Sequence, residues 1–252
     1  MMARFEFIFW EAVKALTLLV LALLAAKAVR TFLRQRRRSA LGPALYGVLV
    51  VLAALGARTI GLDIAAEVYN WVGEKDLDRH QWAAALGNAL RAVELRPGVA
   101  SYWDLLARAK FSTGQYASLL RDEPVFRALN PRGLSEDDLM RFAYCRLFLG
   151  QYREVIPLAD EVIHLNPGYP KAYVIEGLAQ AGLRSYEDAE RNFLKALQIL
   201  PTQADAVEGL AHVYFLMGFT DRALAVLDTT VRYSFPPEAR KRFQALKALY
   251  EQ

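Results

Sequence analysis

The sequence predicts an all-α protein: an N-terminal two-helix transmembrane hairpin, then an α-solenoid of paired helices, then a closing helix. Three observations support this fold class. Proline recurs at Pro97, Pro131, Pro167 and Pro201, at intervals of 34, 36 and 34 residues, and each proline can end a helix. A short turn motif recurs between these prolines. Two long apolar runs precede the first repeat, as a membrane hairpin requires.

The recurrence divides residues 64–237 into five repeats of two helices each. The turn between the two helices begins, in four of the repeats, at Gly114, Gly150, Arg184 and Gly218. The one longer interval is absorbed by Leu134 and Ser135, which we place in a loop. The predicted repeats are 66–99, 100–133, 136–169, 170–203 and 204–237. Residues 238–252 are predicted to form a capping helix, whose polar back protects the end of the array.

The stretch from Tyr169 to Pro201 carries the repeat pattern most fully. Counted from Pro170 as position 1, the residues at positions 4, 8, 17, 20, 24, 27 and 32 are Tyr173, Gly177, Tyr186, Ala189, Phe193, Ala196 and Pro201. Small residues at Gly177 and Ala189 let two antiparallel helices cross closely. The stretch resembles a tetratricopeptide (TPR) repeat along its full length. This resemblance implies a scaffold that binds a partner protein.

Two repeats depart from the pattern. In repeat 66–99 the turn at Asp76–His80 is polar and lacks the usual glycine. In repeat 100–133 the pair Glu123-Pro124 falls inside the second helix, and proline there predicts a break or a kink. Ser135, which precedes three acidic residues, is predicted to be the N-cap of the next helix.

The N-terminal region predicts a membrane hairpin. Residues 10–29 are mostly apolar, and about 20 such residues cross a bilayer. A second apolar run, 43–57, extends to Leu62 if the side chain of Arg58 reaches a headgroup region. The segment between the two runs holds the densest positive charge of the chain. The positive-inside rule then places this loop in the cytoplasm and the repeats in the periplasm of a bacterial inner membrane.

Other interpretations of the N-terminal region stay open. The first run could be a cleaved signal peptide, although Glu6 and Glu11 give its start the wrong charge. A twin-arginine signal would lie too far from the start, and a buried amphipathic helix pair is the remaining alternative. Glu11 and Lys14 either pair at the membrane interface or contact another membrane subunit. The residues predicted to touch anionic lipid headgroups are Arg34, Arg36, Arg37 and Arg38.

The positive charge is confined to the N-terminal region. The chain has 252 residues and a net charge of +4, but residues 1–62 hold nine Arg and Lys residues against two Glu residues. The repeats are therefore mildly acidic. A nucleic-acid-binding function, which the basic pI of about 9.1 would otherwise favour, loses its support.

The sequence contains no recognisable catalytic constellation. His80, His164 and His212 fall in three different repeats without metal-binding spacing, and phosphate-loop and nucleophile motifs are missing. The single cysteine, Cys145, cannot form an internal disulfide and is expected to pack as a small hydrophobic residue. The sequence therefore predicts neither an enzyme nor a metal or cofactor site.

In TPR proteins the first helices of successive repeats line a concave groove, mostly through positions 2, 5, 9 and 12. The resemblance implies a groove here that is charged at both ends and apolar in the middle, which suits a helix or an extended peptide with apolar anchors. The implied residues are Glu67, Asn70, Glu74, Asp104, Arg108, Phe111, Met140, Tyr144, Leu147, Lys171, Val174, Leu178, Asp205, Glu208, His212 and Phe215, with Arg141 and Phe148 beside them. Some TPR proteins hold the two carboxylates of an acidic C-terminus with a set of Lys, Asn and Arg residues in this groove. That set is incomplete here, since Asn70 is followed by Glu74. Several of the aromatic residues could instead pack between repeats.

The predicted layout resembles bacterial inner-membrane TPR scaffolds, namely the scaffold of cytochrome c maturation and the HemY-type proteins. The resemblance implies a membrane-anchored scaffold that holds a partner protein for the assembly or maturation of an envelope complex. The alternative is a permanent structural subunit of a larger membrane machine, such as a secretion, pilus, motility or respiratory apparatus.

Overall fold

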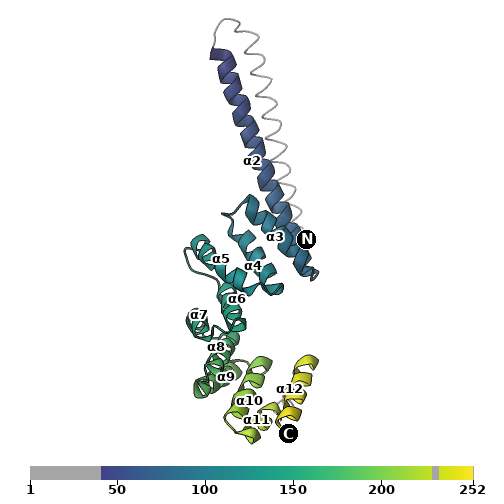
Figure 1. The fold of residues 1–252 in the computed structure, drawn as a ribbon, viewed down its shortest axis with the longest axis vertical. Helices are drawn as coiled ribbons and strands as arrows, with labels where there is room; N and C mark the ends of the chain where they lie inside the picture. Colours follow the sequence, from purple (N-terminus) through teal and green to yellow (C-terminus); the bar gives the residue numbers. More distant parts are fainter. Residues whose placement is uncertain (1–40, 229–232, 252) are drawn as a thin grey trace. The chain divides into compact units, whose positions relative to one another are not determined.

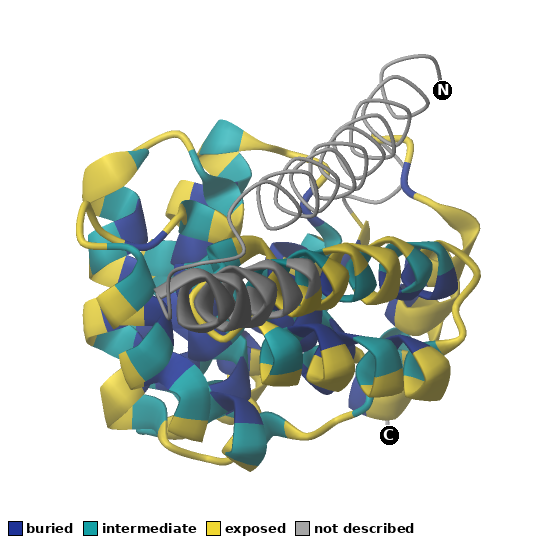
Figure 2. Cartoon of the chain, turned by 90° about the horizontal axis from the view of Figure 1, so that it is seen from above, coloured by how far each residue is buried: buried dark blue, intermediate teal, exposed yellow. Residues whose placement is uncertain are grey.

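The computed structural model describes residues 41–228 and 233–251, with the backbone alone for residues 41–55 and 57. These residues form eleven α-helices and no strand (Figure 1), which confirms the predicted all-α class. Where side chains are described, the helices carry buried residues on one side and exposed residues on the other (Figure 2). The predictions for residues 10–29, Glu11, Lys14 and the four clustered arginines (Arg34, Arg36, Arg37, Arg38) lie outside the described residues.

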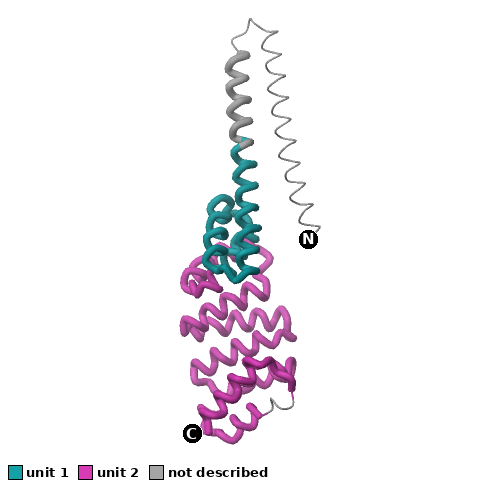
Figure 3. The backbone as a smooth tube through the Cα atoms, turned by 90° about the vertical axis from the view of Figure 1, so that its right-hand side faces the viewer, with its two compact units in different colours: residues 1–109 teal, residues 110–252 magenta. Residues whose placement is uncertain are grey.

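The chain divides into two compact units, residues 1–109 and 110–252, and each is described by itself (Figure 3). The first contains α2 (Leu41–Asp78), α3 (Trp82–Leu95) and most of α4 (Ala100–Ser112). The helices of the second are α5 (Tyr116–Leu129), α6 (Glu136–Phe148), α7 (Tyr152–Leu165), α8 (Pro170–Gly182), α9 (Tyr186–Ile199), α10 (Ala204–Leu216), α11 (Thr220–Asp228) and α12 (Pro237–Tyr250).

Helix α2 is continuous over 38 residues. It joins the second apolar run to the first helix of the first predicted repeat, with no break at residue 63, where the hairpin was expected to end. The reason is local: the stretch 58–66 holds no proline, and a lone glycine such as Gly61 costs a helix only about 1 kcal/mol. None of the helices in the described part of the chain is both long enough and apolar enough to span a bilayer.

The turn inside each helix pair has one recurring geometry. A residue with positive φ stands at His80, Gly114, Gly150, Arg184 and Gly218. The next residue donates its N–H to the carbonyl five residues earlier, at 2.8 Å from Gln81 to Asp76 and at 2.9 Å from Ser185 to Gln180. This bond satisfies an orphan carbonyl at the helix end, as in a Schellman motif. The polar turn of the first repeat therefore adopts the same conformation without a glycine.

Pro124 does not break α5, so of the two predicted effects, a break or a kink, only the kink stays a prediction. The helix runs through it from Tyr116 to Leu129, and α7 likewise contains Pro157. A proline inside a helix removes one hydrogen bond and costs about 3 kcal/mol. In α5 the buried side chains of Leu119 and Phe126 hold the surrounding turns against their neighbours, and this packing outweighs the local cost.

The N-cap prediction for α6 is confirmed. The Oγ atom of Ser135 accepts a hydrogen bond from the backbone N–H of Asp138 at 3.2 Å. Glu136, Asp137 and Asp138 occupy the first turn, where the helix dipole favours negative charge. The loop before Ser135 thus ends in a fixed helix start.

Close helix crossings form the core of the second compact unit. Phe193 of α9 is fully buried, and a Cβ atom on Gly177 of α8 would meet its Cε1 atom at 2.9 Å. A Cβ atom on Gly209 of α10 would overlap the same ring. Ala189 is also fully buried. Gly177 and Ala189 are therefore small for the reason that the sequence indicated, and Gly209 repeats the arrangement in the next helix pair.

Candidate functional site: the first-helix face

The predicted binding residues lie on α2, α4, α6, α8 and α10, which are the first helices of their repeats. Glu67, Asn70, Glu74, Asp104 and Arg108 belong to the first compact unit. The remaining predicted residues belong to the second, and they are Phe111, Met140, Arg141, Tyr144, Leu147, Phe148, Lys171, Val174, Leu178, Asp205, Glu208, His212 and Phe215. We call the surface that these residues of the second unit form the first-helix face.

Four aromatic rings gather at the start of this face in the second compact unit. Phe148 stacks on Tyr116 with ring centroids 4.9 Å apart, and on Tyr144 at 6.2 Å. Phe111 lies 6.3 Å from Phe148 and 6.4 Å from Tyr144. Phe148 is nevertheless 56% exposed. The aromatic cluster, defined as Phe111, Tyr116, Tyr144 and Phe148, thus holds a large apolar ring rigidly at the surface. Sequence reasoning had not included Tyr116.

The environment of Tyr144 connects this cluster to a later helix. The pKa of the Tyr144 phenol is raised to about 12, mainly by burial and to a smaller extent by the negative charge of Asp205 on α10. Tyr169, which precedes α8, acts in the same direction. Helix α8 packs against α6 and against α10, so the first helices of these three repeats lie side by side. The first-helix face is therefore one surface across α6, α8 and α10.

The middle of the face is more closely packed than predicted. Met140 is 4% and Val174 is 1% exposed, so both fill the interior and neither is a surface contact. Position 5 lies close to the neighbouring first helix, and an apolar side chain there is drawn into the crossing. Leu178 is half-buried and Lys171 is exposed. Arg141 is largely covered and pairs with Asp138 at 2.7 Å.

At the C-terminal end, side chains of α12 join the face. Arg242 donates to Glu208 at 2.7 Å and lies 3.4 Å from Asp205. Burial raises the pKa of the Glu208 carboxyl, and Arg242 opposes that rise.

Tyr250 completes this end. Its ring stacks on Phe215 with centroids 4.2 Å apart, and its hydroxyl lies 3.2 Å from Nδ1 of His212. Sequence reasoning missed Arg242 and Tyr250, although Arg242 follows Glu208 by one repeat period of 34 residues.

The corresponding residues of the first compact unit form closed ion pairs. Arg108 donates to Glu74 at 3.0 Å, again one period of 34 residues later, and it also lies 3.8 Å from Asp104. The Tyr102 hydroxyl donates to Glu67 at 2.6 Å, and burial together with this bond raises the Tyr102 pKa. The charges predicted at this end therefore bind each other between successive first helices.

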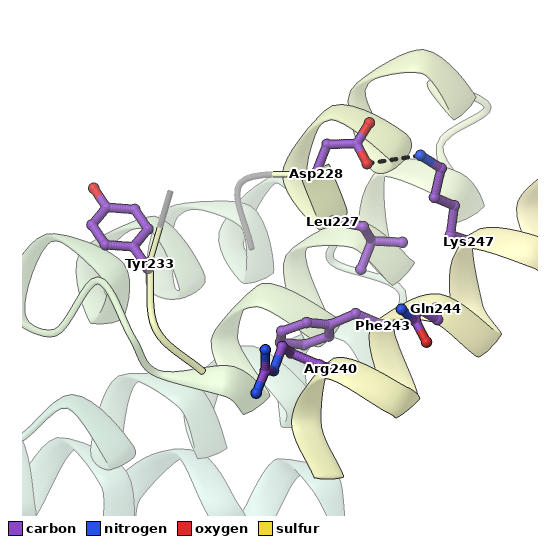
Figure 4. Close-up of a pocket in the computed structure, with 7 residues that line it drawn as sticks. All are labelled: Leu227, Asp228, Tyr233, Arg240, Phe243, Gln244 and Lys247. Atoms are coloured by element: carbon purple, nitrogen blue, oxygen red, sulfur yellow. Dashed lines mark hydrogen bonds and ion pairs between the residues drawn. The ribbon is translucent and has the colours of Figure 1, made fainter. Parts of the chain in front are cut away.

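A separate pocket lies at the end of α11 and beside α12 (Figure 4). It has a volume of about 470 Å³ and is lined by Leu227, Asp228, Tyr233, Arg240, Phe243, Gln244 and Lys247. Lys247 is held by Asp228 at 2.8 Å, as the dashed line shows. No sequence motif pointed to this pocket, because its walls meet only when α12 packs on the last repeat.

Within residues 41–228 and 233–251, no three His, Cys, Asp or Glu side chains lie together as a metal site would require. Cys145 is fully buried, and this burial raises the pKa of its thiol to about 12. It packs as a small hydrophobic residue, as the sequence indicated.

Comparison with known proteins shows which fold the chain shares with them. No protein-family model matches the chain. The Hsp70-Hsp90 organising protein of Plasmodium falciparum is 32% identical over 65 residues, which are 26% of this chain and 26% of that protein. The chain thus matches about a quarter of that relative's length.

Two solved structures cover most of the chain. MamA (residues 41 to the end) of Desulfovibrio magneticus RS-1 superposes with a TM-score of 0.61 at 18% identity, over 67% of this chain and 94% of MamA. YrrB, described as a TPR protein with an unusual peptide-binding site, gives a TM-score of 0.52 at 18% identity, over 65% of this chain and 84% of YrrB. The paired helices of this chain therefore have the fold of the TPR proteins.

Proposed function

We propose that this chain is a membrane-anchored TPR scaffold, which binds a helix or an extended peptide of a partner protein on its first-helix face. The observation that carries the proposal is the aromatic cluster around Phe148. Protein-binding surfaces concentrate their binding energy in a few aromatic residues held rigidly in place. A ring that is 56% exposed while contacting three other aromatic rings meets this description.

The chemistry of the face sets the kind of partner. Phe148, Tyr144 and Leu178 offer apolar and aromatic contacts in the first part of the face. The exposed Phe215, 37% accessible, offers a second apolar contact beside the charged group of Asp205 and Glu208. An amphipathic helix or a strand-like peptide with two separated apolar anchors fits such a surface.

The descriptions of two similar proteins support this proposal. YrrB is described as having a peptide-binding site, and the Plasmodium relative is named an Hsp70-Hsp90 organising protein. Both descriptions concern proteins that interact with other polypeptides. This chain is proposed to do the same, without any claim that it shares their partners.

The membrane part of the proposal rests on the sequence. The apolar runs 10–29 and 43–62, separated by the basic segment, favour a hairpin whose loop faces the cytoplasm. The repeats would then work on the extracytoplasmic side, in the assembly or maturation of an envelope complex. A reporter that works only in the periplasm should be active when it is fused after Gln252. Activity from a cytosol-dependent reporter alone would reverse this orientation.

The binding proposal is tested with a surface variant that should leave the fold intact. Phe148→Ala should weaken partner binding at least tenfold, since a central aromatic anchor is worth about 2 kcal/mol or more. Leu194→Ala is the matched control, because Leu194 lies on the second helix α9 and is 46% exposed. Affinity is measured in detergent with the partner identified by crosslinking from position 148. Equal affinities for both variants would show that the partner does not bind on the first-helix face.

A further inference from the structure

Helix α2 carries an apolar stripe on the face opposite to its packed side. Ile64 is 38% exposed, Val68 is 52% exposed and Trp71 is 44% exposed. The spacing of four and three residues places them on one line along the helix. Ala66 and Leu77, which are buried, lie on the opposite side. Such a stripe of large apolar side chains on a helix surface marks a contact.

The repeat register shows what kind of contact this is. Val68 and Trp71 occupy positions 3 and 6 of their repeat. The residues at these positions are Tyr102 and Leu105 in the second repeat, and Ala172 and Ile175 in the fourth; all four are at most 2% exposed. In the fourth repeat, the element that precedes α8 in the chain, α7, packs against α8.

The first helix of the array therefore exposes apolar side chains at the positions where later first helices are buried, and an element that precedes α2 could pack against them. The element that precedes α2 in the chain is the segment 1–40, which the structure does not describe. Its start holds four aromatic residues within six positions: Phe5, Phe7, Phe9 and Trp10. End repeats of solenoids normally present a polar outer face, and α2 does not. We propose that the aromatic segment 5–10 of the same chain covers the stripe of Ile64, Val68 and Trp71.

The length of chain allows this return. Val68 and Trp71 lie 27 and 30 residues after the start of α2 at Leu41, which is about 40–45 Å at 1.5 Å per residue. Trp10 lies 31 residues before Leu41. Even a fully helical segment of that length spans about 46 Å. The chain is thus long enough for residues 5–10 to reach the level of the stripe if the segment returns antiparallel to α2, and this requires no bound partner protein.

The test is a disulfide between two introduced cysteines in the full chain, in membranes or mild detergent. The variant carries Phe9→Cys, Val68→Cys and Cys145→Ala, and is oxidised gently. Trypsin then releases residues 5–14 and 59–75 as separate peptides, because Arg4, Lys14, Arg58 and Lys75 flank them. We expect these two peptides to be joined, in a protein that migrates as a monomer before digestion. The control pair is Phe9→Cys with Leu90→Cys, since Leu90 on α3 is 48% exposed.

A second measurement follows the accessibility of the stripe directly. A water-soluble maleimide should label Val68→Cys at least about tenfold more slowly in the full chain than after serine replaces Phe5, Phe7, Phe9 and Trp10. Labelling of Leu90→Cys should be equal in both. Joined peptides found only in a covalent dimer would show that a second copy covers the stripe, which overturns the proposal. Absence of the joined peptides together with unchanged labelling would overturn it as well, in favour of lipid or another protein.

Discussion

The ring of Phe193 occupies the space that a side chain on Gly209 would need. The ring comes from α9 and the glycine from α10, so a second helix and the following first helix approach each other here with the Phe193 ring between them and no side chain from Gly209. The same ring faces Gly177 of α8. One phenylalanine thus sets the spacing of three successive helices.

The first prediction concerns this contact. Gly209→Ala should destabilise the protein by about 1–3 kcal/mol, because the methyl group forces the buried ring to move. Gly87→Ala is the control, since nothing lies within 4 Å of a Cβ atom on Gly87 in helix α3. That substitution should be neutral or stabilise by up to about 1 kcal/mol. Denaturant unfolding measures both, and equal effects would contradict the close crossing.

The second prediction concerns the turn between α8 and α9. Arg184 has a φ of 63° where Gly150 has 72° in the preceding repeat. A side chain in this left-handed conformation costs roughly 1 kcal/mol. Arg184→Gly should therefore raise the unfolding free energy by about 0.5–1 kcal/mol. Gly150→Ala should lower it by about the same amount. Denaturant unfolding measures both variants, and a reversal of these two signs would refute the shared turn geometry.

The third prediction concerns a buried carboxyl group. Glu176 of α8 is 9% exposed, and burial raises its pKa, while hydrogen bonds from Asn192 and Gln180 act in the opposite direction. Asp160 and Asp188 add to the rise. An acid whose pKa is higher in the folded state binds its proton more tightly there. Its contribution to stability is thus fully present below the unfolded pKa and falls as the pH rises through the folded pKa.

The measurement is the unfolding free energy of Glu176→Gln and of the native chain between pH 4 and pH 8. Glutamine resembles the protonated acid, so the variant should gain stability relative to the native chain as the pH rises above the usual Glu pKa of about 4.3. Glu187→Gln is the control, because Glu187 is exposed. A difference that does not change with pH, or that favours the native chain at neutral pH, would show that the charged form of Glu176 is the stabilised one.

The fourth prediction concerns the closing helix. Tyr250→Ala removes the stacking on Phe215 and the contact with His212, and it should destabilise the C-terminal end by about 2–4 kcal/mol. Arg242→Ala should cost less than about 1 kcal/mol, because Arg242 is 52% exposed and its ion pairs are screened by solvent. Hydrogen exchange should rise in α10 and α12 of the tyrosine variant. Equal hydrogen-exchange protection in both variants would show that Tyr250 does not hold α12 on the last repeat.

The periodic features of the fold could be predicted from residue types alone. Glycine at Gly114, Gly150 and Gly218 indicated the turns inside the repeats, where the structure has positive φ, and Ser135 indicated the start of its helix. His80 and Arg184 show the limit of that signal, since they adopt the same conformation without glycine. At these two turns the recurring interval in the sequence, and not a glycine, predicted the position of the turn.

The features set by neighbouring helices could not be predicted in the same way. Met140 and Val174 stand at positions that face outward in TPR repeats, yet the adjoining first helices bury them. Pro124 is tolerated because packing on the buried face of α5 opposes its local effect. Arg242 and Tyr250 become part of the first-helix face only through the docking of α12. Each of these outcomes depends on a partner element rather than on the residue itself.

The unbroken course of α2 has a mechanical consequence. The segment 41–62 and the first helix of the first repeat share this 38-residue helix, so a rotation of the segment about the helix axis also rotates the side chains of that repeat helix. Each residue added to a helix rotates the next part of the chain by about 100° and advances it by about 1.5 Å. The contacts of Glu67 with Tyr102 and of Glu74 with Arg108 on α4 therefore also set the rotation of the segment 41–62 about the axis of α2.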